Sequence, residues 1–296
     1  MAQQPMFALI TGCSSGIGKG LAIAFAAKGV TVLATARRAE SLSELTSKYD
    51  NIEAFSLELG NPESIEKLKD AVSIRTGGRL DFLVNNAGTH YAATGVDLEI
   101  EEVAKLFQVN LFAVMQLCQV FVPLLRESAR GQIVQIGSVT RSMPVVWQAP
   151  YNASKAALSQ YTKTLRLELM PLGIEVVEVV TGFVQSNILH HGLHAPENSL
   201  YLPIKDILEK IKYKGNENGM SSDAYATSVV AKLMRPRVSP EIWEGALVRQ
   251  IRFLVTFLPL KTLNWILFRR FRLDLVKAGL DDDTKQSPCS EGTASK

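Results

Sequence analysis

The segment FALITGCSSGIGKGLAIAFAAKG, residues 7–29, decides the fold class of this 296-residue chain. It starts as an apolar strand, turns through a glycine-rich loop and continues as a helix. Gly12 permits the tight turn, whereas Gly16 and Gly18 let backbone and helix approach a pyrophosphate at the positive helix N-terminus. A strand before the glycine trio and a helix after it favour a dinucleotide site over a glycine-rich turn without a ligand.

Further strand-like runs follow, separated by helical patterns. Short apolar strands that alternate with helices imply right-handed crossovers and a sheet buried on both faces. We therefore predict an α/β fold: a single Rossmann-like, doubly wound parallel sheet with helices on both faces, plus a C-terminal helical extension. The further strand candidates are TVLATA (31–36), IEAFSL (52–57), LDFLVNN (80–86), GQIVQIGS (131–138) and IEVVEVVTG (174–182).

The regular alternation ends after Gly182, which sets the expected domain organisation. With 47% hydrophobic residues, the chain can bury one large core, assigned here to a Rossmann-type catalytic domain over 1–240. Residues from about 183 to 220 form a long excursion, and such loops are often substrate lids. We expect an apolar and basic helical extension over 241–278, followed by a disordered polar tail over 279–296.

Composition excludes several classes of protein. A net charge of +3 is too small to indicate nucleic-acid binding. The chain shows no signal peptide and no run of about 18 apolar residues, and its sparse cysteines suggest a reducing compartment, so we expect a cytoplasmic protein. No metal site is expected, because His190, His191 and His194 lie on the excursion without acidic partners at ligand spacing. The three cysteines are Cys13, Cys118 and Cys289.

The end of the second strand indicates which dinucleotide binds. In TVLATARRAE, residues 31–40, no acidic residue occupies the strand end, where one would hold the ribose hydroxyls of NAD. Arg37 and Arg38 stand there instead, and an arginine fork suits a 2′-phosphate. This favours NADP(H) over NAD(H). The alternative is that both are solvated surface arginines at the start of a helix.

The segment APYNASKAALSQYTKTLRLEL, residues 149–169, places Tyr151 and Lys155 four residues apart on one helix face. A cation beside a phenol stabilises the phenolate, so we expect Lys155 to lower the pKa of Tyr151 towards neutrality. Such a tyrosine exchanges a proton with a carbonyl or alcohol oxygen. A bare Tyr–Lys spacing also fits an ordinary helix with an exposed pair.

Other polar residues support the catalytic interpretation. Ser138 follows a strand candidate, at the carboxyl end where ligands bind in such sheets. Residues 85–88, Asn-Asn-Ala-Gly, end the strand candidate before it. Asn110 falls inside a long helical pattern, where asparagine is a poor choice unless its amide has a task.

Together these features identify a resemblance to the short-chain dehydrogenase/reductase family over residues 6–190. It rests on TGCSSGIG (11–18), NNAG (85–88), Asn110, Ser138 and YNASK (151–155). The resemblance implies that Tyr151 is the general acid/base, Ser138 orients the carbonyl, Lys155 also binds the nicotinamide ribose and Asn110 supports a water-linked proton path. The implied cofactor contacts are Gly12, Ser14, Ser15, Gly16, Ile17, Gly18, Arg37, Arg38, Glu58, Asn86, Ala87, Gly88, Tyr151, Lys155, Gly182, Val184 and Ser186.

The chain departs from the family pattern at two places. Glu58 stands where the family often has an aspartate after the third strand. Thr181-Gly182 replaces a Pro-Gly pair after the sixth strand, and Val184 and Ser186 fall where the family holds the nicotinamide carboxamide. Neither departure touches the proposed chemistry.

A further resemblance concerns the substrate. Residues 179–188, 221–234 and 251–274 are similar to fungal NADPH-dependent 1-acyldihydroxyacetone phosphate reductases, which implies reduction of a lipid-like ketone. The alternative within the family is a ketoreductase or alcohol dehydrogenase of fungal secondary metabolism. A non-enzymatic cofactor-binding sensor is a third hypothesis, although all four catalytic positions are filled.

The closing segment, IRFLVTFLPLKTLNWILFRRFRLD (251–274), combines large apolar residues with arginines and a lysine. Pro259 predicts two short helices rather than one long one. The segment suits a membrane interface, such as the surface of the endoplasmic reticulum or a lipid droplet, and it equally suits packing on the domain or on a second subunit of a homo-oligomer. A lipid-like substrate favours the membrane.

Overall fold

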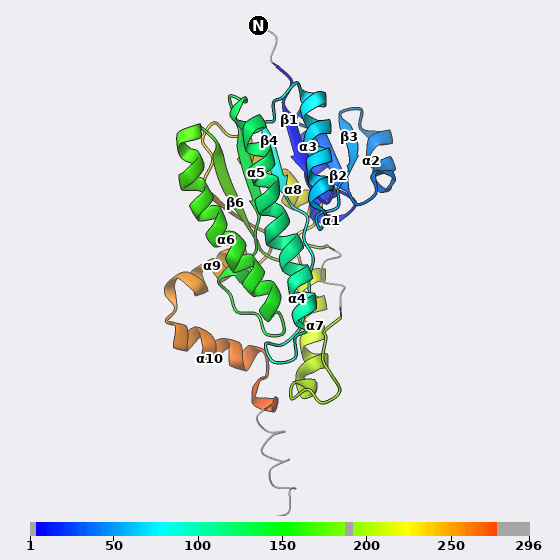
Figure 1. The fold of residues 1–296 in the computed structure, drawn as a ribbon. Helices are drawn as coiled ribbons and strands as arrows, with labels where there is room; N and C mark the ends of the chain where they lie inside the picture. The colour runs from blue at the N-terminus through cyan, green and yellow to red at the C-terminus, as the bar shows by residue number, and fades with distance from the viewer. Residues whose placement is uncertain (1–3, 187–191, 277–296) are drawn as a thin grey trace, which may run out of the picture.

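A seven-stranded parallel sheet forms the centre of the computed structural model, which describes residues 4–186 and 192–276 (Figure 1). The strand order is β3-β2-β1-β4-β5-β6-β7, with every neighbouring pair parallel. The order reverses between β1 and β4, and ligands of such sheets bind at the carboxyl ends of the strands there. The strands are β1 Phe7–Ile10, β2 Thr31–Ala36, β3 Ile52–Ser56, β4 Phe82–Asn85, β5 Gln132–Ile136, β6 Glu175–Thr181 and β7 Glu241–Glu244.

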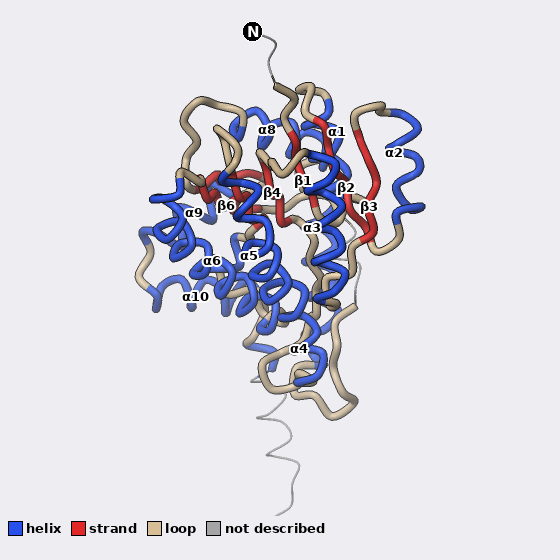
Figure 2. The backbone as a smooth tube through the Cα atoms, turned by 45° about the horizontal axis from the view of Figure 1, so that its top comes forward, coloured by secondary structure: helices blue, strands red, loops and turns tan. Residues whose placement is uncertain are grey.

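Helices cover both faces of the sheet, which confirms the doubly wound fold. One core cluster joins α1 and α8 to one face, and a second joins α3, α5 and α6 to the other (Figures 1 and 2). The helices are α1 Gly16–Ala26, α2 Ser43–Lys48, α3 Pro62–Thr76, α4 Ile100–Phe107, α5 Ala113–Arg126, α6 Ala149–Leu169, α7 Lys205–Glu217, α8 Ser222–Leu233, α9 Val248–Phe257 and α10 Leu260–Arg270.

The edge strand β7 corrects the domain boundary expected at residue 240. Glu241 pairs in register with Glu178 of β6, so the sheet continues past that boundary and the helical extension begins only after β7. The strand has four residues and two of them are glutamates, which hides its pattern in the sequence. Both carboxylates have cationic partners in the fold, Arg141 for Glu241 and Lys232 for Glu244.

The chain from Ile100 to Arg126 is one continuous helix that includes α4, a π-helical turn at Gln108–Phe112 and α5. It is long and apolar enough to cross a membrane, but half of its apolar window is buried inside the structure. Leu117 and Phe121, both fully buried, pack in the core cluster on this face of the sheet. We therefore interpret it as a core helix.

The two ends of the excursion after β6 lie side by side. Val184 forms a parallel bridge with Met220, and the backbone N–H of Gln185 donates to the Met220 carbonyl at 2.9 Å. Among the described residues between these two ends, α7 is the longest helix. The excursion therefore leaves and rejoins the domain at one point, next to the carboxyl end of β6.

The C-terminal extension forms two helices, α9 and α10, separated at Pro259 as predicted. Leu263 and Leu267 of α10 are buried in a third core cluster with Met143 and Trp147. One side of the extension thus packs on the domain, at the end of the sheet far from β3 (Figure 1). The predicted tail 279–296 lies outside the described residues.

Candidate active site

The glycine loop after β1 fits a dinucleotide phosphate group. Gly12 and Gly16 have φ angles of +74° and +55°, in the left-handed region that favours glycine. The N-cap of α1, Ser15, makes no side-chain cap hydrogen bond, and the first turn of the helix contains no acidic residue. The N–H groups at this positive helix end therefore remain suited to an anion.

A clamp between β1 and β4 holds this loop. The Thr11 hydroxyl accepts hydrogen bonds from the backbone N–H groups of Asn86 and Ala87, at 3.0 and 2.9 Å. The Asn86 amide donates to the Thr11 carbonyl at 2.8 Å, and a Cβ on Gly18 would lie 2.5 Å from the same amide nitrogen. The Asn86 side chain thus holds the glycine loop in place. Its contact with the cofactor stays a prediction. We did not predict this role of Thr11 from the sequence. The feature that indicates it there is the position of Thr11 directly before Gly12.

Arg37 and Arg38 lie exposed directly after β2, and neither forms an ion pair among the described residues. Glu58 is exposed after β3, and its backbone N–H bonds Ser64. Both arginines are therefore available for an anionic ligand at the switch-point edge, as a 2′-phosphate requires.

The segment after β6 lies against the glycine loop. Gly182 donates its N–H to the Glu244 carbonyl at 2.8 Å, Val184 is buried, and the Ser186 N–H donates to the Asn216 side chain at 3.0 Å. A Cβ built on Gly16 would lie 3.4 Å from the Ser186 Cβ. Two predicted cofactor contacts, Gly16 and Ser186, are thus neighbours in space.

The catalytic candidates Ser138, Tyr151 and Lys155 meet at the carboxyl end of β5. The Lys155 ammonium lies 5.8 Å from the centroid of the Tyr151 ring and donates a hydrogen bond to the Ile136 carbonyl at 2.9 Å. A hydrogen bond also links Ser138 and Tyr151. Thr140 donates to the Ser138 hydroxyl at 3.0 Å through its own hydroxyl, which fixes the serine oxygen.

The pKa values of this group differ from the expectation. Burial raises the pKa of Tyr151 to about 12, with the Ser138 hydrogen bond opposing, so the predicted lowering towards neutrality is wrong for this structure. Burial lowers the pKa of Lys155 to about 8, against the charge of Glu178. The spacing of the two residues was right, but burial of the phenol outweighs the nearby cation. At pH 7 the Tyr151 phenol is therefore neutral and Lys155 is mainly a cation.

The Asn110 side chain forms hydrogen bonds between elements, which explains why an asparagine stands inside a helix. It lies in the π-helical turn Gln108–Phe112 and is 1% exposed. Its side-chain oxygen accepts from the Thr89 N–H at 2.9 Å, while its amide donates to the Thr89 carbonyl at 3.0 Å and to Ser154 at 3.2 Å. The amide joins the loop after β4 to the catalytic helix α6, and π turns often mark functional sites.

Two aromatic residues of the site escaped sequence reasoning. The His90 ring is buried, with its centroid 4.8 Å from that of Tyr151. Trp147 has a φ angle of +65°, rare for a bulky residue, and its indole donates to the His194 carbonyl at 2.8 Å. Trp147 therefore links the start of α6 to the excursion. The only sequence signal for either residue is its nearness to a motif.

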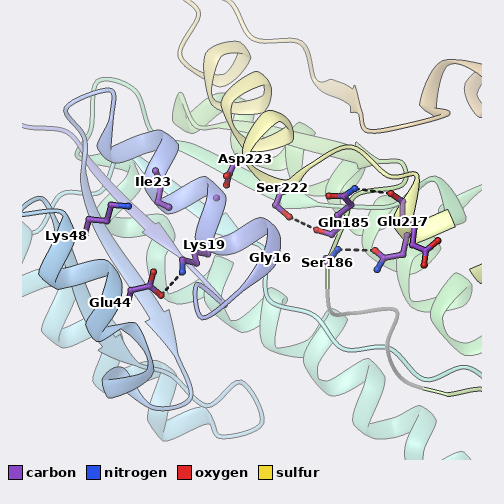
Figure 3. Close-up of a pocket in the computed structure, with 12 residues that line it drawn as sticks. Gly16, Lys19, Ile23, Glu44, Lys48, Gln185, Ser186, Glu217, Ser222 and Asp223 are labelled. Atoms are coloured by element: carbon purple, nitrogen blue, oxygen red, sulfur yellow. Dashed lines mark hydrogen bonds and ion pairs between the residues drawn. The ribbon is translucent and has the colours of Figure 1, made fainter. Parts of the chain in front are cut away.

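A pocket of about 650 Å³ borders the glycine loop on the outer side of α1 (Figure 3). It includes Gly16 and Ser186, and the Lys19–Glu44 ion pair at 2.8 Å crosses its wall. Its lining contains none of the four catalytic candidates. The pocket thus touches the predicted cofactor loop but lies away from the reacting groups.

His194 has an acidic neighbour that the sequence did not reveal. Its Nε2 lies 3.2 Å from a Glu99 carboxylate oxygen. Residues 4–186 and 192–276 contain no group of three His, Cys, Asp or Glu side chains that could hold a metal ion. His190 and His191 lie outside the described residues.

Comparisons with known proteins agree with this geometry. A family model described as short chain dehydrogenase matches residues 6–195. The chain is 39% identical to the short-chain dehydrogenase srdE of Neurospora crassa, covering 87% of this chain and 89% of the relative. It is 36% identical to the NADPH-dependent 1-acyldihydroxyacetone phosphate reductase of Schizosaccharomyces pombe, covering 81% and 85%. A crystal structure of a short-chain dehydrogenase from Streptomyces avermitilis is similar, with 28% identity, a TM-score of 0.74 and coverage of 96% and 97%.

Proposed function

The chain belongs to the short-chain dehydrogenase family, and from that premise we propose that it reduces a ketone to a secondary alcohol with NADPH. The observation that carries the proposal is the meeting of Ser138, Tyr151 and Lys155 at the carboxyl end of β5.

The fit to NADP(H) rests on two features of this chain. The glycine loop leaves the N-terminus of α1 uncapped for a pyrophosphate, and the exposed Arg37 and Arg38 suit a 2′-phosphate. The S. pombe relative is named as NADPH-dependent. When bound, NADPH supplies the hydride, and the protein must supply the proton.

Proton donation falls to Tyr151. With a pKa raised to about 12, its phenol is protonated at pH 7 and can donate to the carbonyl oxygen as that oxygen gains charge. The Ser138 hydroxyl, linked to Tyr151, orients the same oxygen. The Lys155 cation stabilises the phenolate that remains. Asn110 keeps the loop after β4 against α6 and supports the path of proton resupply.

The substrate class that we propose is a lipid-like ketone such as a 1-acyl dihydroxyacetone phosphate. The S. pombe relative supports this class. A ketoreductase or alcohol dehydrogenase of fungal secondary metabolism is the alternative. The N. crassa relative has a higher identity than the S. pombe one, and its name specifies no substrate. In both cases we propose that the excursion forms a wall of the substrate pocket, since Trp147 ties it to α6.

A peripheral membrane site is the second part of the proposal. The side of α9 and α10 that faces away from the domain, here called the C-terminal apolar face, exposes large apolar side chains beside exposed basic ones. This combination suits a membrane interface, and we place the enzyme at the cytoplasmic side of such a surface, for example that of the endoplasmic reticulum or a lipid droplet. The exposed residues are Phe253, Phe257, Leu260, Trp265 and Phe268, with Arg249, Arg252, Lys261, Arg269 and Arg270.

Turnover with a ketone panel tests the catalytic proposal. NADPH oxidation is followed at 340 nm with 1-acyl dihydroxyacetone phosphate, unacylated dihydroxyacetone phosphate and a set of cyclic and aromatic ketones. We expect the acylated substrate to give the highest kcat/KM. Preference for a cyclic or aromatic ketone would instead support the secondary-metabolism alternative. NADPH binding without oxidation by any ketone would support a sensor.

A further inference from the structure

Glu178 is a buried carboxylate behind the active site. It lies in the middle of β6, between two pairs of valines, and is 0% exposed. Its Oε2 atom accepts hydrogen bonds from the Arg141 guanidinium and, at 3.0 Å, from the Ser159 hydroxyl. Its Oε1 atom has no hydrogen-bond partner among the described residues. A buried carboxylate is costly, so a role is expected for it.

The carboxylate touches both elements that carry the catalytic groups. A Cβ built on Gly137 would lie 2.6 Å from Glu178 Oε1, so the carboxylate rests on the backbone of Gly137. Gly137 joins Ile136, whose carbonyl accepts from Lys155 at 2.9 Å, to Ser138. On the other side, Ser159 is one helical turn beyond Lys155 on α6.

The charges around Glu178 and Lys155 explain what the carboxylate does. Arg141 follows Ser138 in a short 3-10 turn and also bonds Glu241 of β7 at 2.8 Å. Burial raises the pKa of Glu178, opposed by the charge of Arg141 and the bond from Ser159. The charge of Glu178 in turn raises the pKa of Lys155, opposing burial. The charged or titratable groups facing the pair are Arg141 after β5, Tyr151 and Arg166 on α6, and Glu241 on β7.

We propose that Glu178 is a positioning residue of the reaction: its carboxylate braces the backbone between Ile136 and Ser138 and places a negative charge close to the Lys155 ammonium. The proposal rests on the proposed function for its catalytic meaning. The effect on the charge of Lys155 can be measured without any substrate.

The charge effect is tested in the full-length, cofactor-free protein. The Cε signal of ¹³C-labelled Lys155 is followed by NMR across pH 6–11, and Lys155→Arg assigns the signal. Glu178→Gln keeps the shape of the side chain but removes its charge. We therefore expect the midpoint of the Lys155 titration to move down by about one pH unit. Glu241→Gln, the matched control on the other partner of Arg141, is expected to move it much less. An equal midpoint in wild type and Glu178→Gln would overturn the proposal.

The kinetic arm uses the best ketone from the panel. In Glu178→Gln the upper pH limit of kcat moves down with the Lys155 midpoint, whereas a merely destabilising change lowers kcat equally at every pH. Glu178→Asp, which retains a charge, is expected to restore most of the midpoint. If Glu178→Gln does not fold, Glu178→Met replaces it, because methionine has a similar size without the charge and Arg141 keeps Glu241 as its partner. A Lys155 midpoint unchanged in Glu178→Met would then overturn the proposal. Failure of every ketone leaves the NMR result intact and refutes only the catalytic assignment.

Discussion

At the scale of single residues, the structure places a neutral phenol beside a buried ammonium. The pKa of Tyr151 is about 12 and that of Lys155 about 8, both because of burial. Reduction of a ketone needs this pair of charge states, a neutral phenol and an ammonium that stabilises the phenolate. Activity in the reducing direction should therefore fall as pH rises through the pKa of Lys155.

Replacement of Tyr151 by phenylalanine should remove the proton donor and leave the cofactor site. We expect kcat for ketone reduction to fall about 10²–10⁴-fold, while NADPH binding changes little. Steady-state kinetics and fluorescence titration with NADPH measure the two effects. Tyr161→Phe is the matched control and should retain activity. Tyr161 lies on the same helix, but its hydroxyl is hydrogen-bonded to Cys118. A Tyr151→Phe enzyme with more than about a tenth of wild-type kcat would refute the assignment.

Replacement of Lys155 by methionine should inactivate the enzyme and stabilise its fold. The pKa of Lys155 falls from 10.5 to about 8 on folding, so the unfolded chain binds this proton more tightly and the penalty is largest below pH 8. At pH 7 the free energy of unfolding should rise by roughly 1–3 kcal/mol, less the lost bond to Ile136. The gain should shrink as pH rises from 8 towards 10.5.

Thermal unfolding at pH 7 and pH 10 measures that gain. Lys163→Met, an exposed lysine on the same helix, is the control and should change Tm little at either pH. An equal gain for Lys155→Met at both pH values would show that the buried charge is not its cause.

Sequence patterns predicted which catalytic candidates meet but not their electrostatics. The spacing of Tyr151 and Lys155 follows from helix geometry, which is local, so their contact was predictable. The pKa of Tyr151 depends on how much of the sheet and excursion covers it, which no spacing shows. Glu178 left a signal, a charge between two pairs of valines, but its partner Arg141 comes from another element.

At the scale of elements, the first six strands were predictable because each is short, apolar and followed by a turn or helix signal. The seventh was not. β7 contains Glu241 and Glu244, whose charges become acceptable in a strand only through Arg141 and Lys232 from other elements. The hydrogen bonds between Asn110 and Thr89 also need the fold, because the two residues come from different elements.

The turn after β2 should determine cofactor choice. Arg37→Ala combined with Arg38→Ala should weaken NADPH binding at least about tenfold and leave NADH binding nearly unchanged, because each charge-assisted bond to phosphate contributes about 1.5–3 kcal/mol. Dissociation constants for both cofactors measure this. Arg235→Ala with Arg237→Ala removes the same charge from an exposed pair before β7 and serves as the control. Retained preference for NADPH would place the phosphate site elsewhere.

At the scale of the whole molecule, α9 and α10 present two faces. Ile251, Leu263 and Leu267 pack on the domain, while the C-terminal apolar face points outward. The sequence could not separate packing on the domain from contact with another surface, because both need apolar residues. The structure assigns different residues to the inner face and leaves the outer face exposed.

Substitutions on the C-terminal apolar face should weaken binding to anionic liposomes. Phe257→Ser, Leu260→Ser and Trp265→Ser together alter residues that are 61–70% exposed, so the fold should survive. A truncation at Glu241 would not serve, because it removes β7 from the sheet. Cosedimentation at low and high salt measures binding, which salt should reduce.

The control for this experiment is the triple change Ile74→Ser, Val96→Ser and Leu167→Ser, since these exposed apolar residues lie elsewhere on the surface. Its binding should equal that of wild type. If wild-type protein stays in the supernatant and elutes as a dimer that the Phe257–Leu260–Trp265 variant loses, the face is instead an interface between two copies of the chain.

The paired ends of the excursion have a consequence for how such an enzyme acquires new substrates. Val184 and Met220 are partners in a β-bridge, so the two ends of the excursion lie side by side. A segment of almost any length can therefore be exchanged between them without changing the distance that the rest of the chain must span. Lengthening a loop between fixed ends adds little entropy cost, about 0.6 kcal/mol per doubling. If the excursion forms a wall of the substrate pocket, as proposed, then insertions, deletions and transplanted segments alter selectivity here while the sheet, α6 and the glycine loop are inherited unchanged.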